Sequence, residues 1–253
     1  MPSYGHLCTE FYDLDKPAAP RDEYEFYLAY ARRTGGPILE PMCGSGRFLV
    51  PMLAQGFDVT GTDSSRAMLD ACRESARRIG IIPVLHEQTL EDLALDRQFA
   101  LVFIPAGSFG LIIDPAALGV SIRRLYAVMR HGATLVFEIE RLMLKSHHGN
   151  SWTGNWGGRW IDRPDGAKLM ISWLSRYDKD ERVVRSIHRY EVFKDGRLLE
   201  TEMEDFAVRP HDPMELQKTL EAGGFANVRI LKVHSDQPAG GEDTELIVEC
   251  RKP

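Results

Sequence analysis

The chain has 253 residues, 43% of them apolar, which is enough to bury the core of one large domain or of one domain with an insertion. Its formal net charge of -6 gives no bulk positive field for nucleic acid, so we expect no nucleic-acid partner. The four cysteines lack metal-ligand spacing, the opening MPSYGHLCTE lacks a signal-peptide pattern, and no apolar run approaches the roughly 18 residues of a membrane span. A cytoplasmic location without a membrane partner is therefore expected.

Strand-like and helix-like segments alternate through the first half of the chain. Apolar runs bounded by Gly, Pro or Asp predict strands, and apolar residues three and four apart that end at Gly predict helices. The predicted strands are 36–42, 57–63, 82–88, 98–106 and 133–140, and the predicted helices are 47–56, 64–80 and 114–132. This alternation predicts a parallel sheet with right-handed crossovers and helices on both faces.

The pattern changes after the fifth strand. Residues 141–165 are rich in Gly, Trp and Asn and show no period, and three alternating segments joined by DKDE and KDG follow them. Such short connections predict an antiparallel β meander. The chain then ends in a predicted helix and two predicted strands, 212–225, 226–234 and 244–252. We expect 1–140 and 209–253 to form one domain, with its N-terminal segment as a cover, and 141–208 to be an insertion.

The stretch ILEPMCGSG ends a predicted buried strand with an acid and follows it with a loop of small residues. Gly44 and Gly46 allow a ligand close to the backbone, at the sheet edge where such folds bind ligands. The dinucleotide fingerprint GxGxxG is incomplete, because Leu49 takes its third glycine position. Glu40 would repel a pyrophosphate but suits an ammonium group, and Asp63 at the next strand tip suits ribose hydroxyls. S-adenosylmethionine carries both an ammonium group and a ribose, so it could interact with both acids. Taken singly, Glu40 could instead cap a helix or form an ion pair, Asp63 could cap a helix, and the two glycines could form a plain turn.

The stretch ILEPMCGSGRFLVPMLAQGFDVTGTDSSRAMLDACR at 38–73 resembles the class I S-adenosylmethionine-dependent methyltransferases of small-molecule type. FALVFIPAGSFGLI resembles their fourth strand, and LYAVMRHGATLVFEIE resembles the region of their fifth, with only Gly132 kept of the usual Pro-Gly-Gly. The resemblance covers 20–140 and, more loosely, 212–253. It implies a Rossmann-like α/β sheet of seven strands in the order 3-2-1-4-5-7-6, the last strand antiparallel, and S-adenosyl-L-methionine as the methyl donor.

The resemblance also implies which residues bind the donor. Thr89 stands where the family often has an acid that contacts the adenine amino group, so its hydroxyl or the amide of Leu90 would make that contact. Tyr12 lies in a segment that resembles the mobile cover of many relatives. The full set expected at the donor is Tyr12, Glu40, Met42, Gly44, Gly46, Arg47, Asp63, Ser64, Thr89, Leu90 and Pro105.

Methyl transfer from a sulfonium needs little from the protein beyond alignment of the acceptor, and a general base is optional. The candidates for such a base at the carboxyl edge of the sheet are Glu138, Glu140, His147 and His148, and the two histidines also fit a solvated loop. Adjacent histidines point in different directions and no third ligand follows them, so we expect no metal.

The inserted segment has two readings. Three tryptophans in it either line a lid over the acceptor or pack the meander onto the main sheet: Trp152, Trp156 and Trp160. The meander itself either forms a wall of the acceptor pocket or joins two subunits as a homodimer. A small-molecule acceptor methylated on O or N is the leading hypothesis. Its alternatives are methyl transfer to protein or RNA, a Rossmann-type nucleotide-dependent oxidoreductase, and a non-catalytic module that binds the donor.

Overall fold

The computed structural model describes residues 4–141 and 156–253. A seven-stranded sheet has the order β10-β11-β5-β4-β1-β2-β3, in which β11 runs antiparallel to β5 and the strands from β5 to β3 are parallel. This is the predicted order, and the predicted α/β sheet is confirmed. Its strands are β1 (Ile38–Pro41), β2 (Val59–Asp63), β3 (Val84–Glu87), β4 (Phe99–Ile104), β5 (Met129–Glu140), β10 (Ala226–Lys232) and β11 (Glu245–Arg251).

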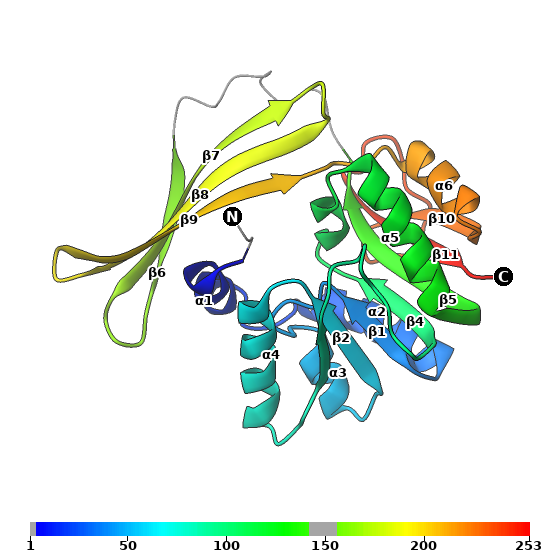
Figure 1. Cartoon of the computed structure of the whole chain (residues 1–253), viewed down its shortest axis with the longest axis horizontal. Helices are drawn as coiled ribbons and strands as arrows, with labels where there is room; N and C mark the ends of the chain where they lie inside the picture. Colours follow the sequence, from blue (N-terminus) through cyan, green and yellow to red (C-terminus); the bar gives the residue numbers. More distant parts are fainter. Residues whose placement is uncertain (1–3, 142–155) are drawn as a thin grey trace.

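Helices cover both faces of this sheet (Figure 1). The helices are α1 (His6–Asp15), α2 (Arg21–Thr34), α3 (Leu49–Ala54), α4 (Arg66–Arg78), α5 (Pro115–Val128) and α6 (Pro213–Ala222), with a 3-10 turn η1 (Ser108–Leu111). Capping side chains mark the first turns of three of these helices. Asp114 and Asp212 cap α5 and α6, each followed by a proline in the first turn, and the Ser65 hydroxyl accepts from Met68 N–H at the start of α4.

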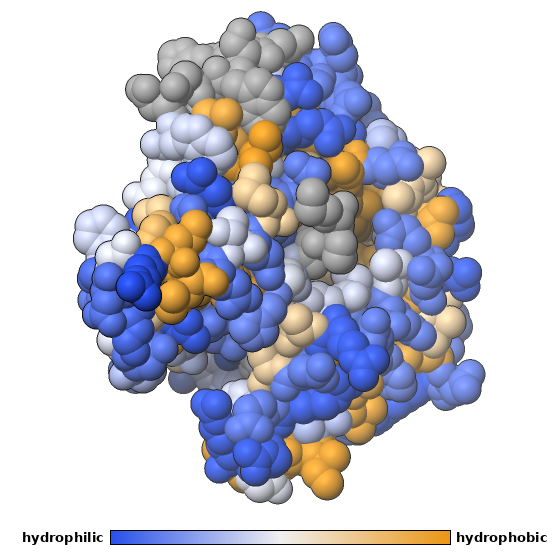
Figure 2. All heavy atoms as spheres, turned by 60° about the vertical axis from the view of Figure 1, so that its left-hand side comes forward, coloured by the Kyte–Doolittle hydropathy of each residue, from blue (hydrophilic) through white to orange (hydrophobic). Residues whose placement is uncertain are grey.

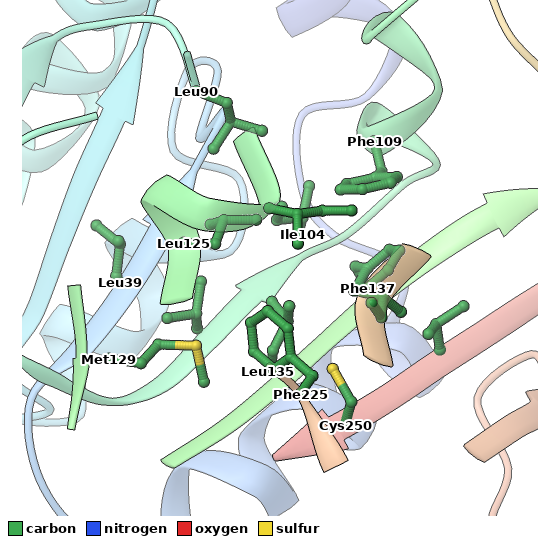
Figure 3. Packing of buried hydrophobic residues seen from close by; sticks show 14 of the residues in the cluster. Leu39, Leu90, Ile104, Phe109, Leu125, Met129, Leu135, Phe137, Phe225 and Cys250 are labelled. Carbon is green, nitrogen blue, oxygen red and sulfur yellow. The ribbon is translucent and has the colours of Figure 1, made fainter. Parts of the chain in front are cut away.

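Alternate side chains of the central strands belong to two apolar clusters, one on each face of the main sheet. Leu39, Val102 and Leu135 point to the side of α5 and α6 (Figure 3), whereas Ile38 and Leu101 point to the side of α2, α3 and α4. All five are completely or almost completely buried, as expected for parallel strands covered on both faces. The core therefore holds the carboxyl ends of β1, β2 and β4 at fixed positions along one edge.

A second sheet has four strands in the order β6-β7-β8-β9: β6 (Gly157–Asp162), β7 (Lys168–Asp178), β8 (Val183–Lys194) and β9 (Arg197–Val208). All its pairings are antiparallel, which confirms the predicted meander. Figure 1 shows it projecting from the main sheet, with α1 lying against it. Leu7, Cys8 and Phe11 of α1 pack there on Leu169, Tyr190 and Val192.

Two local predictions were wrong. The helix expected to reach 132 ends at Val128, because Met129 adopts extended dihedrals and pairs with Phe99 as the first residue of β5. The segment 157–162, expected to be aperiodic, is an edge strand, and its exposed side chains explain the missing apolar period. The segment TEFYDLDKP precedes the helix α2, as expected, and most of it lies within α1.

Candidate functional site

The tips of β1 and β2 are joined by a carboxylate. Asp63 Oδ2 accepts from the backbone N–H of Gly44, and Oδ1 accepts from the N–H of Ser65, both at 2.8 Å. Burial raises the pKa of Asp63, while the backbone N–H donors oppose that rise. Gly44 has φ +54, and a side chain there would point toward Met68 Sδ at 3.8 Å, so the loop is open on this side. Asp63 thus fixes the loop and still has lone pairs available for a ligand.

Glu40 lies at the other side of the same loop. Its side chain is 1% exposed, and Oε2 has no hydrogen-bond partner within the described residues. Burial raises its pKa well above the ordinary carboxyl value. A buried acceptor without a partner is costly unless a ligand satisfies it, and a cationic group would both donate to it and return it to the ionised form.

Arg47 and Tyr12 complete this end of the site. The guanidinium of Arg47 lies 5.6 Å from the centre of the Tyr12 ring and 5.2 Å from that of Phe48. Its buried Nε has no partner within the described part of the chain. Helix α1 therefore places an aromatic ring over a cation at the mouth of the glycine loop.

One cavity of about 550 Å³ brings together nearly all the residues predicted to bind the donor. Those that line it are Tyr12, Glu40, Met42, Gly44, Arg47, Asp63, Ser64, Thr89, Leu90 and Pro105. Gly46 does not line it. An added Cβ at Gly46 would lie 2.5 Å from Cys72 Sγ, so this glycine is required by the packing of α4 against the loop.

The cavity continues past the end of β4 to the second sheet. This half, which we call the acceptor half, is formed by Ser108, Leu111, Ile112, Ile113, Glu140 and residues 205–208. The β9 residues were not among the predicted site residues, because the sequence of a meander gives no sign of which strand docks on the main sheet. Arg209 at the end of β9 donates its backbone N–H to Gly110 O at 2.7 Å, which ties β9 to the loop after β4.

The described candidates for a general base differ in the cavities that they line. Glu140 lines both the acceptor half and a second cavity of about 500 Å³ next to it, whereas Glu138 lines only the second cavity. Glu138 Oε1 accepts from Tyr27 Oη at 2.6 Å and lies 3.2 Å from His234 Nε2. His147, His148 and Trp152 lie outside the described residues.

Trp156 and Trp160 do not pack the meander onto the main sheet, which was one of the two roles predicted for them. Trp156 is 47% exposed and Trp160 61% exposed, so neither is buried between the two sheets. Trp160 lies on β6, next to the backbone of Met170 on β7. The structure therefore places these two rings on the surface of the second sheet.

The comparison with known proteins agrees with this geometry. Residues 38–132, from β1 to the start of β5, match a family model described as a methyltransferase domain. A curated protein from Geobacillus sp. (strain WCH70), named as the methyltransferase GWCH70_2453 by inference, is similar to part of the chain. The two are 24% identical over 142 residues, which are 54% of this chain and 58% of that protein. The chain thus spans little more than half the length of this relative.

Solved structures resemble the chain along almost its entire length. An S-adenosylmethionine-dependent methyltransferase from Clostridium acetobutylicum ATCC 824 has a TM-score of 0.77 at 18% identity, covering 96% of both chains. The sugar N-methyltransferase KedS8 from Streptoalloteichus sp. ATCC 53650 has a TM-score of 0.70 at 21% identity, covering all of this chain and 97% of its own. At such identities the likeness concerns the fold.

Residues 38–132 therefore resemble a methyltransferase domain, and the described chain has the fold of the class I S-adenosylmethionine-dependent methyltransferases. The resemblance identified from its sequence is confirmed. Within the described residues, no helix is both long and apolar enough to cross a membrane.

Proposed function

We propose that this protein is an S-adenosyl-L-methionine-dependent methyltransferase that methylates an amine nitrogen of a small polar molecule. The observation that carries the proposal is the continuous cavity that runs from the glycine loop to β9. In its first half, carboxylates are placed to accept hydrogen bonds from a nucleoside and from an ammonium group. Its second half has space for the methyl acceptor.

The donor residues fit the proposed ligand. Asp63 at the tip of β2 is placed to accept from ribose hydroxyls, and the unpartnered Oε2 of Glu40 is placed to accept from an α-ammonium group. Leu90 and Thr89 line the far wall, where an adenine ring would lie. S-adenosyl-L-methionine supplies a methyl group on a positively charged sulfur, which is a good leaving group.

The acceptor half favours a cationic molecule. Its charged residues are Glu140 on β5 and Asp205 on β9, both acidic and on different walls. Such a pair attracts an amine and orients it, while apolar contacts from Ile112, Phe206 and Val208 exclude water from the reacting atoms. Glu140 is the described candidate to accept the amine proton before transfer, since Glu138 lies in the neighbouring cavity. The named function of KedS8 as a sugar N-methyltransferase is consistent with this class of acceptor.

The experiment is a product assay with a matched acceptor panel. The full chain is incubated with S-adenosyl-L-methionine and with pairs of amino sugars and their hydroxyl counterparts, and S-adenosylhomocysteine is quantified. We expect turnover with at least one amino sugar and none with its hydroxyl partner. Turnover restricted to hydroxyl compounds, peptides or RNA, or binding of the donor without turnover on any acceptor, would refute the amine proposal. Calorimetric binding of NAD in preference to S-adenosyl-L-methionine would refute the donor as well.

We also propose that the outer face of the second sheet joins two copies of the chain. Trp160 and Met203 lie on the face opposite α1, and they are 61% and 40% exposed. Figure 2 turns forward the left-hand side of Figure 1, where the second sheet projects, and shows apolar patches among charged surface. Exposed aromatic and methionine side chains on one sheet face are typical of protein interfaces.

Light scattering tests this assembly. The wild type is expected to have twice the chain mass, and the pair Trp160→Glu and Met203→Glu is expected to be a monomer. Ile82→Glu is the control, because Ile82 is 94% exposed and lies just before β3 of the main sheet, not on the second sheet. A monomeric wild type, or a dimer that survives both substitutions, would refute the proposed interface.

A further inference from the structure

The second cavity contains a group of side chains that the proposed methyl transfer does not use. It has a volume of about 500 Å³ and shares Lys16, Arg47, Ala106, Gly107 and Glu140 with the donor cavity. Glu23 from α2, Glu138 from β5 and His234 from the turn after β10 converge on it. Three elements far apart in the sequence thus place two carboxylates and an imidazole at one point.

Glu138 and His234 are held in place rather than lying free on the surface. Their side chains are only 12% and 15% exposed. The Tyr27 hydroxyl orients the Glu138 carboxylate, and the ring of Phe26 packs edge-on against His234 with centroids 5.6 Å apart. A hydrogen bond from an outer group to a carboxylate, such as that from Tyr27 to Glu138, is one of the contacts that orient ligands at metal centres.

The spacing of the three groups suits one small ion. One ligand atom from each residue lies within 4.8 Å of the other two, and Glu138 Oε1 is 3.2 Å from His234 Nε2. Ligands bonded at about 2.1 Å to one tetrahedral ion are about 3.4 Å apart, so this pair already has a suitable separation. Glu23 lies at the edge of the cavity on the first turn of α2, and a rotation of its flexible side chain would bring its carboxylate closer.

The charges around the group also favour a cation. Asp15, Glu140 and Glu245 line the same cavity in addition to the two glutamates of the group, against Lys16, Arg47 and the imidazole. After burial, the charge of Glu138 is the main cause that raises the pKa of Glu23, which reflects repulsion between two nearby carboxylates. A divalent ion between them would remove that repulsion.

We propose that Glu23, Glu138 and His234 bind a divalent first-row transition-metal ion in the range from Mn²⁺ to Zn²⁺. Carboxylate oxygens with one imidazole nitrogen suit these ions better than a set of oxygens alone, which suits Mg²⁺ or Ca²⁺. Three protein ligands leave at least one coordination position for water or another small ligand. None of the three proposed ligands lines the donor cavity, although the two cavities share Arg47 and Glu140 among their lining residues. The site was not expected from the sequence, where only the adjacent histidines were considered as ligands.

Calorimetry with the metal alone tests the site. The full chain is treated with EDTA, dialysed, and titrated with MnCl₂ and, separately, with ZnCl₂. We expect one saturable site per chain for at least one of the two ions. Glu138→Gln and His234→Gln should each weaken binding at least tenfold, whereas Glu245→Gln, in the same cavity but outside the group, should leave it within twofold. Circular dichroism melts check that each variant folds, and Glu23→Gln, at the edge of the cavity, serves if either does not.

Two results would overturn the proposal. The first is the absence of saturable binding of both ions to the wild type, and the second is binding that Glu138→Gln, His234→Gln and Glu23→Gln all leave unchanged. The three residues would then form an ordinary ion pair with a neighbouring acid. Titration of S-adenosylhomocysteine in the presence of EDTA keeps this result distinct from the proposed donor site, because donor binding requires none of the three residues.

Discussion

The carboxylate of Glu202 on β9 caps helix α1, although the two lie almost 200 positions apart. Its Oε2 accepts from Leu7 N–H and its Oε1 from Cys8 N–H, both at 3.0 Å. No side chain within α1 performs this task. The neighbouring Glu204 similarly accepts from Tyr4 N–H at 2.8 Å. The second sheet therefore holds the N-terminal cover in place over the donor cavity, which Tyr4 and Tyr12 line.

Replacing Glu202 with Ala should detach α1 from the second sheet. Hydrogen bonds to a charged group contribute about 1.5–3 kcal/mol each when partly buried, so we expect a loss of stability of this order. Affinity for S-adenosylhomocysteine should fall as well, because the cover loosens. Urea unfolding and calorimetry measure the two effects. Glu200→Ala, an exposed position on the same strand, is the control and should change neither. Equal behaviour of the two variants would exclude a capping role for Glu202.

Gly46 and Gly56 form a matched pair for testing why the loop contains glycine. Both have φ +84, but a Cβ at Gly46 would lie 2.5 Å from Cys72 Sγ, whereas one at Gly56 would meet nothing within 4 Å. Gly56→Ala should cost about 1–2 kcal/mol from the backbone alone. Gly46→Ala should cost about 1–3 kcal/mol more, through overpacking against α4. Denaturant melts of both variants measure the difference, and equal losses would show that the packing around Gly46 relaxes without cost.

Glu40 should make both stability and donor binding depend on pH. Because burial raises its pKa in the folded chain, the folded state keeps a proton that the unfolded state releases. Stability of the ligand-free protein should therefore fall as pH rises from the ordinary carboxyl pKa toward the raised one. An ammonium group near Glu40 lowers that pKa again, so donor binding should release a proton and strengthen as pH rises.

Calorimetry in buffers of different ionisation enthalpy counts the released proton. The measurement is made below about pH 7, where the donor's own α-amino group stays protonated. Glu40→Gln should abolish the release and weaken binding. Asp63, whose pKa is also raised by burial, remains in that variant and serves as the internal control. Proton release that persists in Glu40→Gln would assign it to another group.

Asp205 and Glu140 should contribute to recognition of a cationic acceptor. Both are exposed at the rim of the acceptor half, and exposed charge pairs contribute about 0.2–1 kcal/mol. Asp205→Asn should therefore raise KM for an amine about two- to fivefold with kcat little changed, whereas Glu140→Gln should also lower kcat if it accepts the amine proton. Steady-state kinetics with an active amino sugar separate the two effects, and raising the salt concentration should shrink the difference in KM.

The sequence predicted those parts of the molecule whose signal is local. The β1 loop, the acid ending β2 and the alternation of strands and helices each follow from neighbouring residues. The main sheet was therefore predicted, and ten of the residues predicted to bind the donor line one cavity. Strand β6 was missed because an edge strand with exposed Trp160 has no apolar alternation. The Glu202 cap and the β9 wall depend on docking between sheets, which no short segment encodes. Glu138 was predicted as a candidate base from its strand position, which does not distinguish two adjacent cavities, and this role remains a prediction.

The most direct test of the account is a crystal structure of the full chain with S-adenosylhomocysteine. We predict that the ribose hydroxyls contact Asp63, that the amino group contacts Glu40, and that the sulfur faces the half of the cavity formed by Glu140 and Asp205. A complex in which Glu40 and Asp63 both turn away from the ligand, or in which the sulfur faces solvent instead of β9, would contradict it.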